Sequence, residues 1–191
     1  MNIQTILAGQ VARIDGSGPL ADAITDALER SGAYIARGVN QDRLNILVTL
    51  IEPIPSAPLS QLDISDYDRA FDRTMASLYA ALHAAVPLIK ASGGGSIVTV
   101  MTVGRSMDDP LTLGLADGVE SITAGFASTF AVAPDAIRTN GIRIGGATSA
   151  DERRAVGETV AVLASDQSSY MNGMTVPLHS PARPIAERTA S

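Results

Sequence analysis

The 191-residue sequence has no cysteine, no tryptophan and a single lysine, Lys90. The absence of cysteine excludes disulfides, thiolate nucleophiles and cysteine-ligated metals, and it fits a reducing compartment. Fourteen Lys and Arg against 20 Asp and Glu give a formal net charge of -6. This balance argues against a nucleic-acid partner, because phosphate backbones bind clustered basic side chains.

Long apolar runs are also missing, since none approaches the ~20 residues that span a bilayer. Met1–Gln10 carries no Lys or Arg before its apolar residues, unlike a secretory signal. We therefore expect a cytoplasmic protein with neither a membrane nor a nucleic acid as its partner.

The sequence does contain an alternation of apolar strands and long amphipathic helices. The stretch Leu44–Gly146 is predicted to form, in order, a strand, a helix, a strand, a helix and a strand: Leu44–Ile51, Asp66–Ala91, Ser96–Val103, Leu113–Val132 and Ile137–Ile144. This alternation is typical of an open, mostly parallel α/β sheet. We expect one domain over residues 1–180 and a polar tail over 181–191.

Shorter elements are predicted on either side of this stretch. They are a strand at Val11–Ile14, a helix at Pro19–Ser31 and a helix at Asp151–Ala164. Gly16 and Gly18 lie in the turn between the first strand and its helix. A dinucleotide pyrophosphate binds at such a turn, although an ordinary turn into a helix has the same pattern.

The region from Ala33 to Leu44 is short for a crossover between parallel strands. After Tyr34–Arg37, which is predicted to be an edge strand or a loop, only Gly38–Arg43 remain. A crossover needs a dozen or more residues, and six extended residues reach only ~20 Å. We therefore predict that the second βα unit is shortened or deleted, leaving a sheet edge that a partner's strand could cover.

Three phrases of the sequence resemble the short-chain dehydrogenase/reductase family of Rossmann-type NAD(P) enzymes. They are "PLIKASGGGSIVTV" (Pro87–Val100), "APDAIRTNGIRIGGAT" (Ala133–Thr148) and "VAVLASDQSSYMNGMTVPLHS" (Val160–Ser180). The resemblance covers about Val11 to Ser180. It implies a Rossmann-like, doubly wound sheet with a nicotinamide cofactor at its carboxyl edge.

The cofactor motif of the family is not kept. The three glycines of its Gly-x-x-x-Gly-x-Gly turn correspond to Asp15, Pro19 and Ala21, so Gly16 and Gly18 are out of register. They remain the only candidates for cofactor binding. The family's Asn-Asn-Ala-Gly, which lies beside the adenine, is replaced by Thr49–Glu52. We therefore expect no bound cofactor.

The positions that carry catalysis in the family have also changed. Its helix Asn corresponds to Ser77 and its carbonyl-polarising Ser to Thr102. Its Tyr-x-x-x-Lys corresponds to Thr112 and Ala116. Thr is a far weaker acid than a phenol of pKa ~10, and Ala has no charge to lower that pKa. We therefore expect no catalytic residue at these positions.

Two histidines remain as candidates for other chemistry. His83, on the first long helix, fits a packing or interface residue better than a catalyst. His179 has no cysteine and no neighbouring histidine in the sequence, so we predict no metal site.

These observations favour a catalytically degenerate member of the family that acts as a scaffolding or regulatory subunit. The resemblance implies assembly with itself or with an active paralogue through the two long helices and the last strand. The candidate interface residues are Phe71, Met75, Tyr79, His83, Phe126 and Phe130.

Two alternatives stay open. One is an NAD(P)-dependent oxidoreductase that uses Thr102, Thr112 or His83 as an unorthodox proton donor. The other is a small-molecule-binding protein, or an enzyme of another class, that uses the crevice at the carboxyl edge of the sheet.

Overall fold

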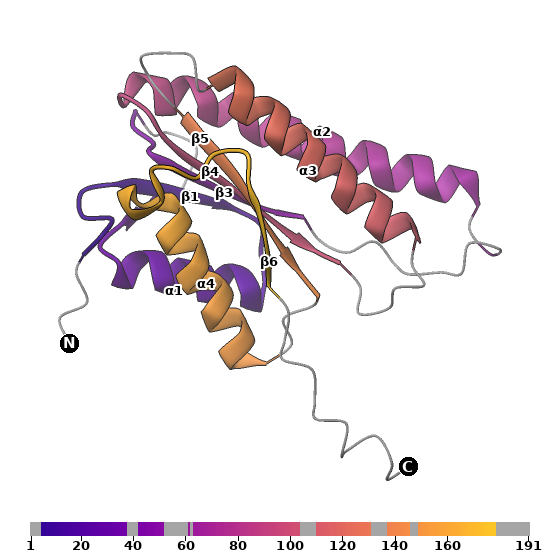
Figure 1. Ribbon diagram of the computed structural model, residues 1–191, viewed down its shortest axis with the longest axis horizontal. Helices are drawn as coiled ribbons and strands as arrows, with labels where there is room; N and C mark the ends of the chain where they lie inside the picture. Colours follow the sequence, from indigo (N-terminus) through magenta and orange to yellow (C-terminus); the bar gives the residue numbers. More distant parts are fainter. Residues whose placement is uncertain are drawn as a thin grey trace, which may run out of the picture.

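A single sheet of six parallel strands lies between two layers of helices (Figure 1). The computed structural model describes residues 5–37, 42–51, 61, 63–103, 110–130, 137–145 and 149–178. The strand order is β2-β1-β3-β4-β5-β6. The strands are β1 (Val11–Asp15), β2 (Tyr34–Ile35), β3 (Ile46–Ile51), β4 (Gly95–Thr102), β5 (Ile137–Ile144) and β6 (Thr175–Leu178).

The helices are divided between the two faces of the sheet. In Figure 1, α1 (Pro19–Arg30) and α4 (Ala150–Ala164) cover one face, and α2 (Ile64–Ala91) and α3 (Pro110–Phe130) cover the other. A single 3-10 turn, η2 (Asp166–Ser168), follows α4. This is the doubly wound α/β architecture predicted from the sequence.

Each helix layer buries its apolar face against the sheet in a separate core. The β-branched and aliphatic residues of β3 and β4 point alternately into the two cores, so these strands are buried on both faces. The core beneath α1 and α4 includes Ile24, Leu28, Ile46, Val98, Val160 and Leu163. The core beneath α2 and α3 includes Leu47, Leu82, Ile89, Ile97, Met101 and Val119.

The predicted strand Leu44–Ile51 begins two residues late, at Ile46. The two preceding residues make other hydrogen bonds. The N–H of Leu44 donates to the Ser92 hydroxyl at 3.2 Å, and the N–H of Val11 donates to the side-chain oxygen of Asn45 at 3.1 Å. These side-chain bonds add to backbone bonds, since the N–H of Asn45 donates to the Val11 carbonyl at 2.8 Å and the N–H of Ser96 donates to the Asn45 carbonyl at 2.9 Å.

The connection between β2 and β3 is short, as predicted, but for a different geometric reason. Ile35, the last residue of β2, pairs with Ala12, and Ile46, the first residue of β3, pairs with the same residue. The chain therefore crosses β1 without returning along the length of a strand. The described part of this connection, residues 36–37 and 42–45, contains no helix.

Arg138 of β5 holds the end of α4 and the η2 turn in place. Its guanidinium donates hydrogen bonds of 2.8 to 3.3 Å to the carbonyls of Leu163, Ala164, Ser165 and Ser168. Cations are favoured at helix C-termini, where carbonyls lack partners within the helix. Burial lowers the pKa of Arg138 below its usual value, and the nearby Asp166 partly offsets this effect.

No helix in the described part of the chain is both long and apolar enough to cross a membrane. The predicted tail over 181–191, like His179, lies outside the described residues.

Candidate functional site

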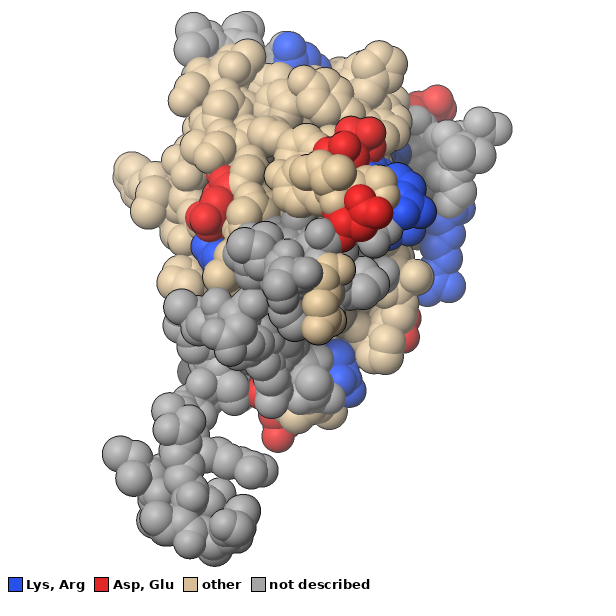
Figure 2. Space-filling model, turned by 90° about the vertical axis from the view of Figure 1, so that its right-hand side faces the viewer, with Lys and Arg blue, Asp and Glu red and all other residues tan. Residues whose placement is uncertain are grey.

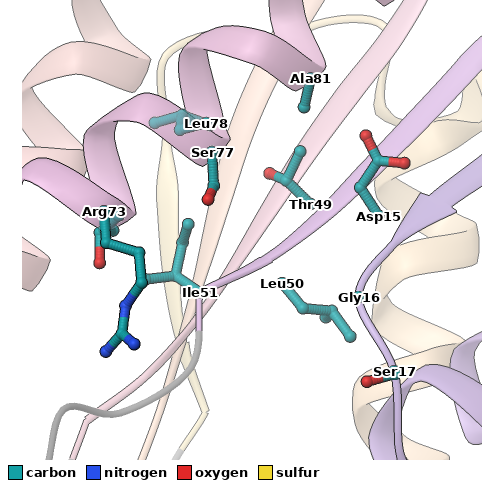
Figure 3. Close-up of a pocket in the computed structure, with 11 residues that line it drawn as sticks. Asp15, Gly16, Ser17, Thr49, Leu50, Ile51, Arg73, Ser77, Leu78 and Ala81 are labelled. Atoms are coloured by element: carbon teal, nitrogen blue, oxygen red, sulfur yellow. The ribbon is translucent and has the colours of Figure 1, made fainter. Parts of the chain in front are cut away.

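A cavity of about 460 Å³ lies where β1 and β3 end, against one face of α2. The chain leaves β1 toward β2 on one side of the sheet and continues from β3 toward β4 on the other, so these two carboxyl ends form the switch point of the sheet. Ligands of open α/β sheets bind at such a point. The lining residues, most of them drawn in Figure 3, are Asp15, Gly16, Ser17, Thr49, Leu50, Ile51, Arg73, Thr74, Ser77, Leu78 and Ala81.

Leu50 closes the side of the cavity next to the turn after β1. A Cβ added to Gly16 would lie 2.6 Å from Leu50 Cδ1, so the leucine side chain packs directly on the glycine backbone. Figure 3 shows Leu50 extending from β3 toward Gly16 and Ser17. Only a residue without a side chain permits this contact.

The start of α1 is not capped by a side chain. Gly18 is the N-cap with φ 91° and makes no side-chain capping bond, and Pro19 occupies the first turn without an N–H. Gly16 lines the cavity, whereas Gly18 does not. With Leu50 over Gly16 and the Asp15 carboxylate beside it, these residues do not fit the pyrophosphate of a dinucleotide.

Asp15 is held by a half-buried arginine at one end of the cavity. Arg13 Nη2 donates to Asp15 Oδ2 at 3.0 Å and to the carbonyl oxygen of Ala81 at 3.2 Å. This contact ties β1 to α2. Arg13 Nε is buried without a hydrogen-bond partner, and Asp15 Oδ1 has no partner among the described residues.

Polar side chains of α2 and β3 line the rest of the cavity. Figure 3 shows the Thr49 and Ser77 hydroxyls facing the space between β3 and α2, with the Arg73 guanidinium near Ile51. Thr49 Oγ1 donates to Thr99 Oγ1 at 3.1 Å. Arg73, Thr74 and Ser77 make no side-chain hydrogen bond or ion pair with the described residues.

The four residues that the resemblance aligns with catalytic positions do not come together in this cavity. Ser77 lines it, whereas Thr102, Thr112 and Ala116 do not. Thr102 ends β4, paired with Ile144. Thr112 and Ala116, each 4% exposed, are buried on α3.

Three of the candidate interface residues, Tyr79, Phe126 and Phe130, form a row of rings across α2 and α3. Tyr79 is 60% exposed and packs edge-on against Phe126, with ring centroids 6.1 Å apart. Phe126 stacks on Phe130 at 5.6 Å, and Lys90 Nζ lies 6.0 Å from the Phe130 ring. Phe71 and Met75 are half-buried and His83 is exposed on α2.

Arginines supply functional groups that the sequence analysis missed. Arg143, at the carboxyl end of β5, pairs with Asp117 at 2.9 Å and with Glu120 at 3.1 Å. Its positive charge is therefore neutralised by carboxylates of α3. Arg73 precedes Ser77 by one helical turn, and this spacing was the available signal that the two share a face.

The described charged residues form no evident metal site. Among them, no group of three or more His, Asp and Glu side chains is close enough to hold a metal ion. On the side of the molecule where α2 begins, the described acidic and basic side chains lie next to one another (Figure 2).

Comparison with known proteins identifies the fold. No family model matches the sequence, and no curated protein matches it. Many solved structures match the fold, and the three described next are short-chain dehydrogenases or reductases by name or by fold.

Three of these solved structures illustrate the match. A gluconate 5-dehydrogenase from Burkholderia cenocepacia J2315, solved with NADP and tartrate, is 17% identical with a TM-score of 0.77, over 94% of this chain and 97% of that one. A short chain dehydrogenase from Mycobacterium smegmatis is 20% identical with a TM-score of 0.75, over 95% and 96%. A 3-ketoacyl-(acyl-carrier-protein) reductase from Brucella melitensis, solved with NADH, is 16% identical with a TM-score of 0.76, over 92% and 98%.

At these identities the likeness shows the fold and not the activity. The predicted Rossmann-like fold of the short-chain dehydrogenases is confirmed. The same fold holds nicotinamide cofactors in the Burkholderia and Brucella proteins.

Proposed function

We propose that this chain is a non-catalytic, scaffolding or regulatory subunit with a short-chain dehydrogenase fold. It assembles with itself or with an active relative of that fold. The observation that carries the proposal is the chemistry of α3, where Thr112 and Ala116 stand at the family's Tyr and Lys positions. Neither residue can pass a proton to or from a substrate alcohol at neutral pH.

The burial of these two residues supports the proposal. Both are 4% exposed, so neither side chain is presented to a substrate in this structure. The nearest strong cation on β5, Arg143, is already paired with two carboxylates of α3 and is a poor substitute for the missing lysine.

The turn after β1 supports the absence of a nicotinamide cofactor. The Leu50 side chain packs on Gly16, and Asp15 places a carboxylate at the end of the strand where a pyrophosphate would bind. Repulsion between like charges and the lost approach to the backbone both disfavour a dinucleotide.

The outer surface of α2 and α3 supports an assembly role. Its rings form a continuous row from Tyr79 through Phe126 to Phe130, and Tyr79 is largely exposed. Exposed aromatic side chains are enriched at protein interfaces, where they bury much area at a low entropic cost. The terminal strand β6 is the second expected contact.

The first experiment is native mass spectrometry of the tagged protein purified gently from its own cells. We expect an oligomer without bound NAD(P), made of this chain alone or of this chain and a different dehydrogenase polypeptide in a fixed ratio. In a mixed complex, nucleotide mass should follow the number of partner chains. A monomer, or a homo-oligomer with one NAD(P) per chain, would contradict the proposal.

The alternative is an NAD(P)-dependent oxidoreductase with unorthodox catalytic residues. It is favoured by the cofactors in two of the structural neighbours and by the hydroxyl of Thr102 at the end of β4. His83 is exposed on α2 and does not line the cavity, which weakens its candidacy as the proton donor. A homo-oligomer saturated with NAD(P) in the same spectrum would support this alternative.

A further inference from the structure

The cavity at the ends of β1 and β3 has the size and lining of a small-molecule site. Its volume of about 460 Å³ falls within the range of ligand pockets. It is lined by charged groups and hydroxyls from three elements, namely β1, β3 and α2. None of the family's catalytic positions except Ser77 contributes to it.

Several polar groups of the lining have no partner among the described residues. The Arg73 guanidinium makes no ion pair there, and the hydroxyls of Thr74 and Ser77 make no hydrogen bond. Asp15 accepts from Arg13 through Oδ2 and keeps Oδ1 free as an acceptor. The lining thus offers the guanidinium of Arg73, one carboxylate oxygen of Asp15 and several hydroxyls between them.

The positions of these groups predict the orientation of a bound ligand. Figure 3 shows Asp15 on one side of the space, Arg73 on the other, and the Thr49 and Ser77 hydroxyls between them. A guanidinium binds a carboxylate or phosphate with parallel hydrogen bonds. Asp15 Oδ1 can accept a hydrogen bond from a hydroxyl, and the hydroxyls of α2 can donate to or accept from further ones.

The charge balance decides between an acid and a zwitterion. Arg13 and Asp15 neutralise each other across 3.0 Å, and among the described residues of the lining Arg73 then carries the one uncompensated charge. A ligand with a single acid group and neutral hydroxyls restores neutrality. A zwitterion would add an ammonium group beside the already paired Asp15 and leave the site charged.

We infer that this cavity binds a small polyhydroxylated acid. The acid group lies on Arg73, the hydroxyls lie along Ser77 and Thr74, and a terminal hydroxyl donates to Asp15. The site is independent of the proposed interface on the outer surface of α2 and α3. Its residues also do not depend on a bound nicotinamide cofactor.

Isothermal titration calorimetry with three five-carbon probes tests this inference. Xylonate carries the acid and the hydroxyls, xylitol lacks the acid, and pentanoate lacks the hydroxyls. We expect xylonate to bind at least about tenfold more tightly than either other probe, since each loses charged or buried hydrogen bonds. Xylitol 5-phosphate, as a fourth probe, distinguishes a phosphate acid group from a carboxylate.

Two variants and a matched control locate the site. Arg73→Gln should weaken the binding of the acid about tenfold or more and leave xylitol unchanged. Asp15→Asn should weaken binding by a smaller factor. Arg69→Gln lies one helical turn earlier on α2, outside the lining, and should leave binding unchanged.

Two outcomes would overturn the inference. One is that neither xylonate nor xylitol 5-phosphate binds. The other is that Arg73→Gln and Arg69→Gln weaken binding equally, which would indicate general attraction of anions to the surface. Binding is measured on the purified chain, so its result is separate from that of the assembly experiment.

Discussion

Arg138 joins three segments that are distant in the sequence. From β5 it donates to the last carbonyls of α4 and to Ser168 of η2, including the Ser168 hydroxyl at 3.0 Å. Its neighbours Ser165 and Ser168 are buried, so the carbonyls have no water to replace the guanidinium. The side chain therefore fixes where α4 ends and where the chain turns toward β6.

We expect Arg138→Gln to lower the free energy of unfolding by about 2–4 kcal/mol, because buried carbonyls lose charged donors. Urea denaturation followed by circular dichroism measures this loss. Arg154→Gln is the control. Arg154 pairs with Asp151 on the exposed face of α4, and its loss should change stability by less than about 0.5 kcal/mol. Equal effects of the two substitutions would refute the capping role.

At the residue scale, the sequence predicted some parts of the site and not others. The replacement of the family's glycines and of its Tyr and Lys is visible in the sequence. That Leu50 packs on Gly16 is not, because the contact joins two strands and depends on a rotamer of a partly buried leucine. The pairing of Arg13 with Asp15 could have been predicted, since alternate residues of a strand share a face.

The backbones of α1 and α4 approach each other closely at Gly157. A Cβ at Gly157 of α4 would lie 2.6 Å from the carbonyl oxygen of Ala23 and 3.0 Å from Ala27 Cβ on α1. Only a glycine lets the two backbones approach this closely. Arg30 and Glu158, 4.0 Å apart on the exposed side, add a weak ion pair.

We expect Gly157→Ala to destabilise the protein despite the better helix propensity of alanine. Overpacking costs about 1–3 kcal/mol, and the propensity returns only about 1 kcal/mol. Thermal unfolding measures the net loss. Gly118→Ala on α3 is the matched control, since its Cβ meets nothing within 4 Å, and it should raise stability. A Gly157→Ala variant that is more stable than the original protein would show that α1 and α4 can move apart at little energetic cost.

At the element scale, periodicity predicted the helices well and the strand edges less well. The strand Ile137–Ile144 agrees residue for residue with the prediction. β3 begins at Ile46, although the backbone of Asn45 already bonds Val11 and Ser96. The short β2–β3 connection was predicted. That Ile35 and Ile46 both pair with Ala12 was not, because this depends on strand register, which composition does not encode.

At the scale of the whole molecule, the row of rings on α2 and α3 is the strongest candidate for a contact between subunits. β6 offers less than expected as a second contact. The Met174 carbonyl accepts a hydrogen bond from the N–H of Gly141 in β5. Because backbone groups of successive residues face opposite edges of a strand, those of Thr175 and Pro177 face the free edge of the sheet. Proline has no N–H to donate there, and prolines of this kind discourage edge pairing.

We expect Tyr79→Asp to dissociate the assembly, since it places a charge at the exposed end of the aromatic row. Sedimentation velocity at several concentrations measures the change in mass. Tyr170→Asp is the matched control, because Tyr170 is 99% exposed between η2 and β6 and makes no ring contact with that row. An unchanged mass for Tyr79→Asp would place the interface elsewhere.

The packing of α1 on α4 also has a consequence for how the chain is made. Part of the apolar face of α1, including Ala27, packs on α4, which can form only when residues 150–164 have been synthesised. At a translation rate of about 5–20 residues per second, this part of α1 waits several seconds or more for its partner helix. Although α1 is made well before α4, it is thus among the last elements to complete its packing, and we expect that interval to be when the chain most needs a chaperone.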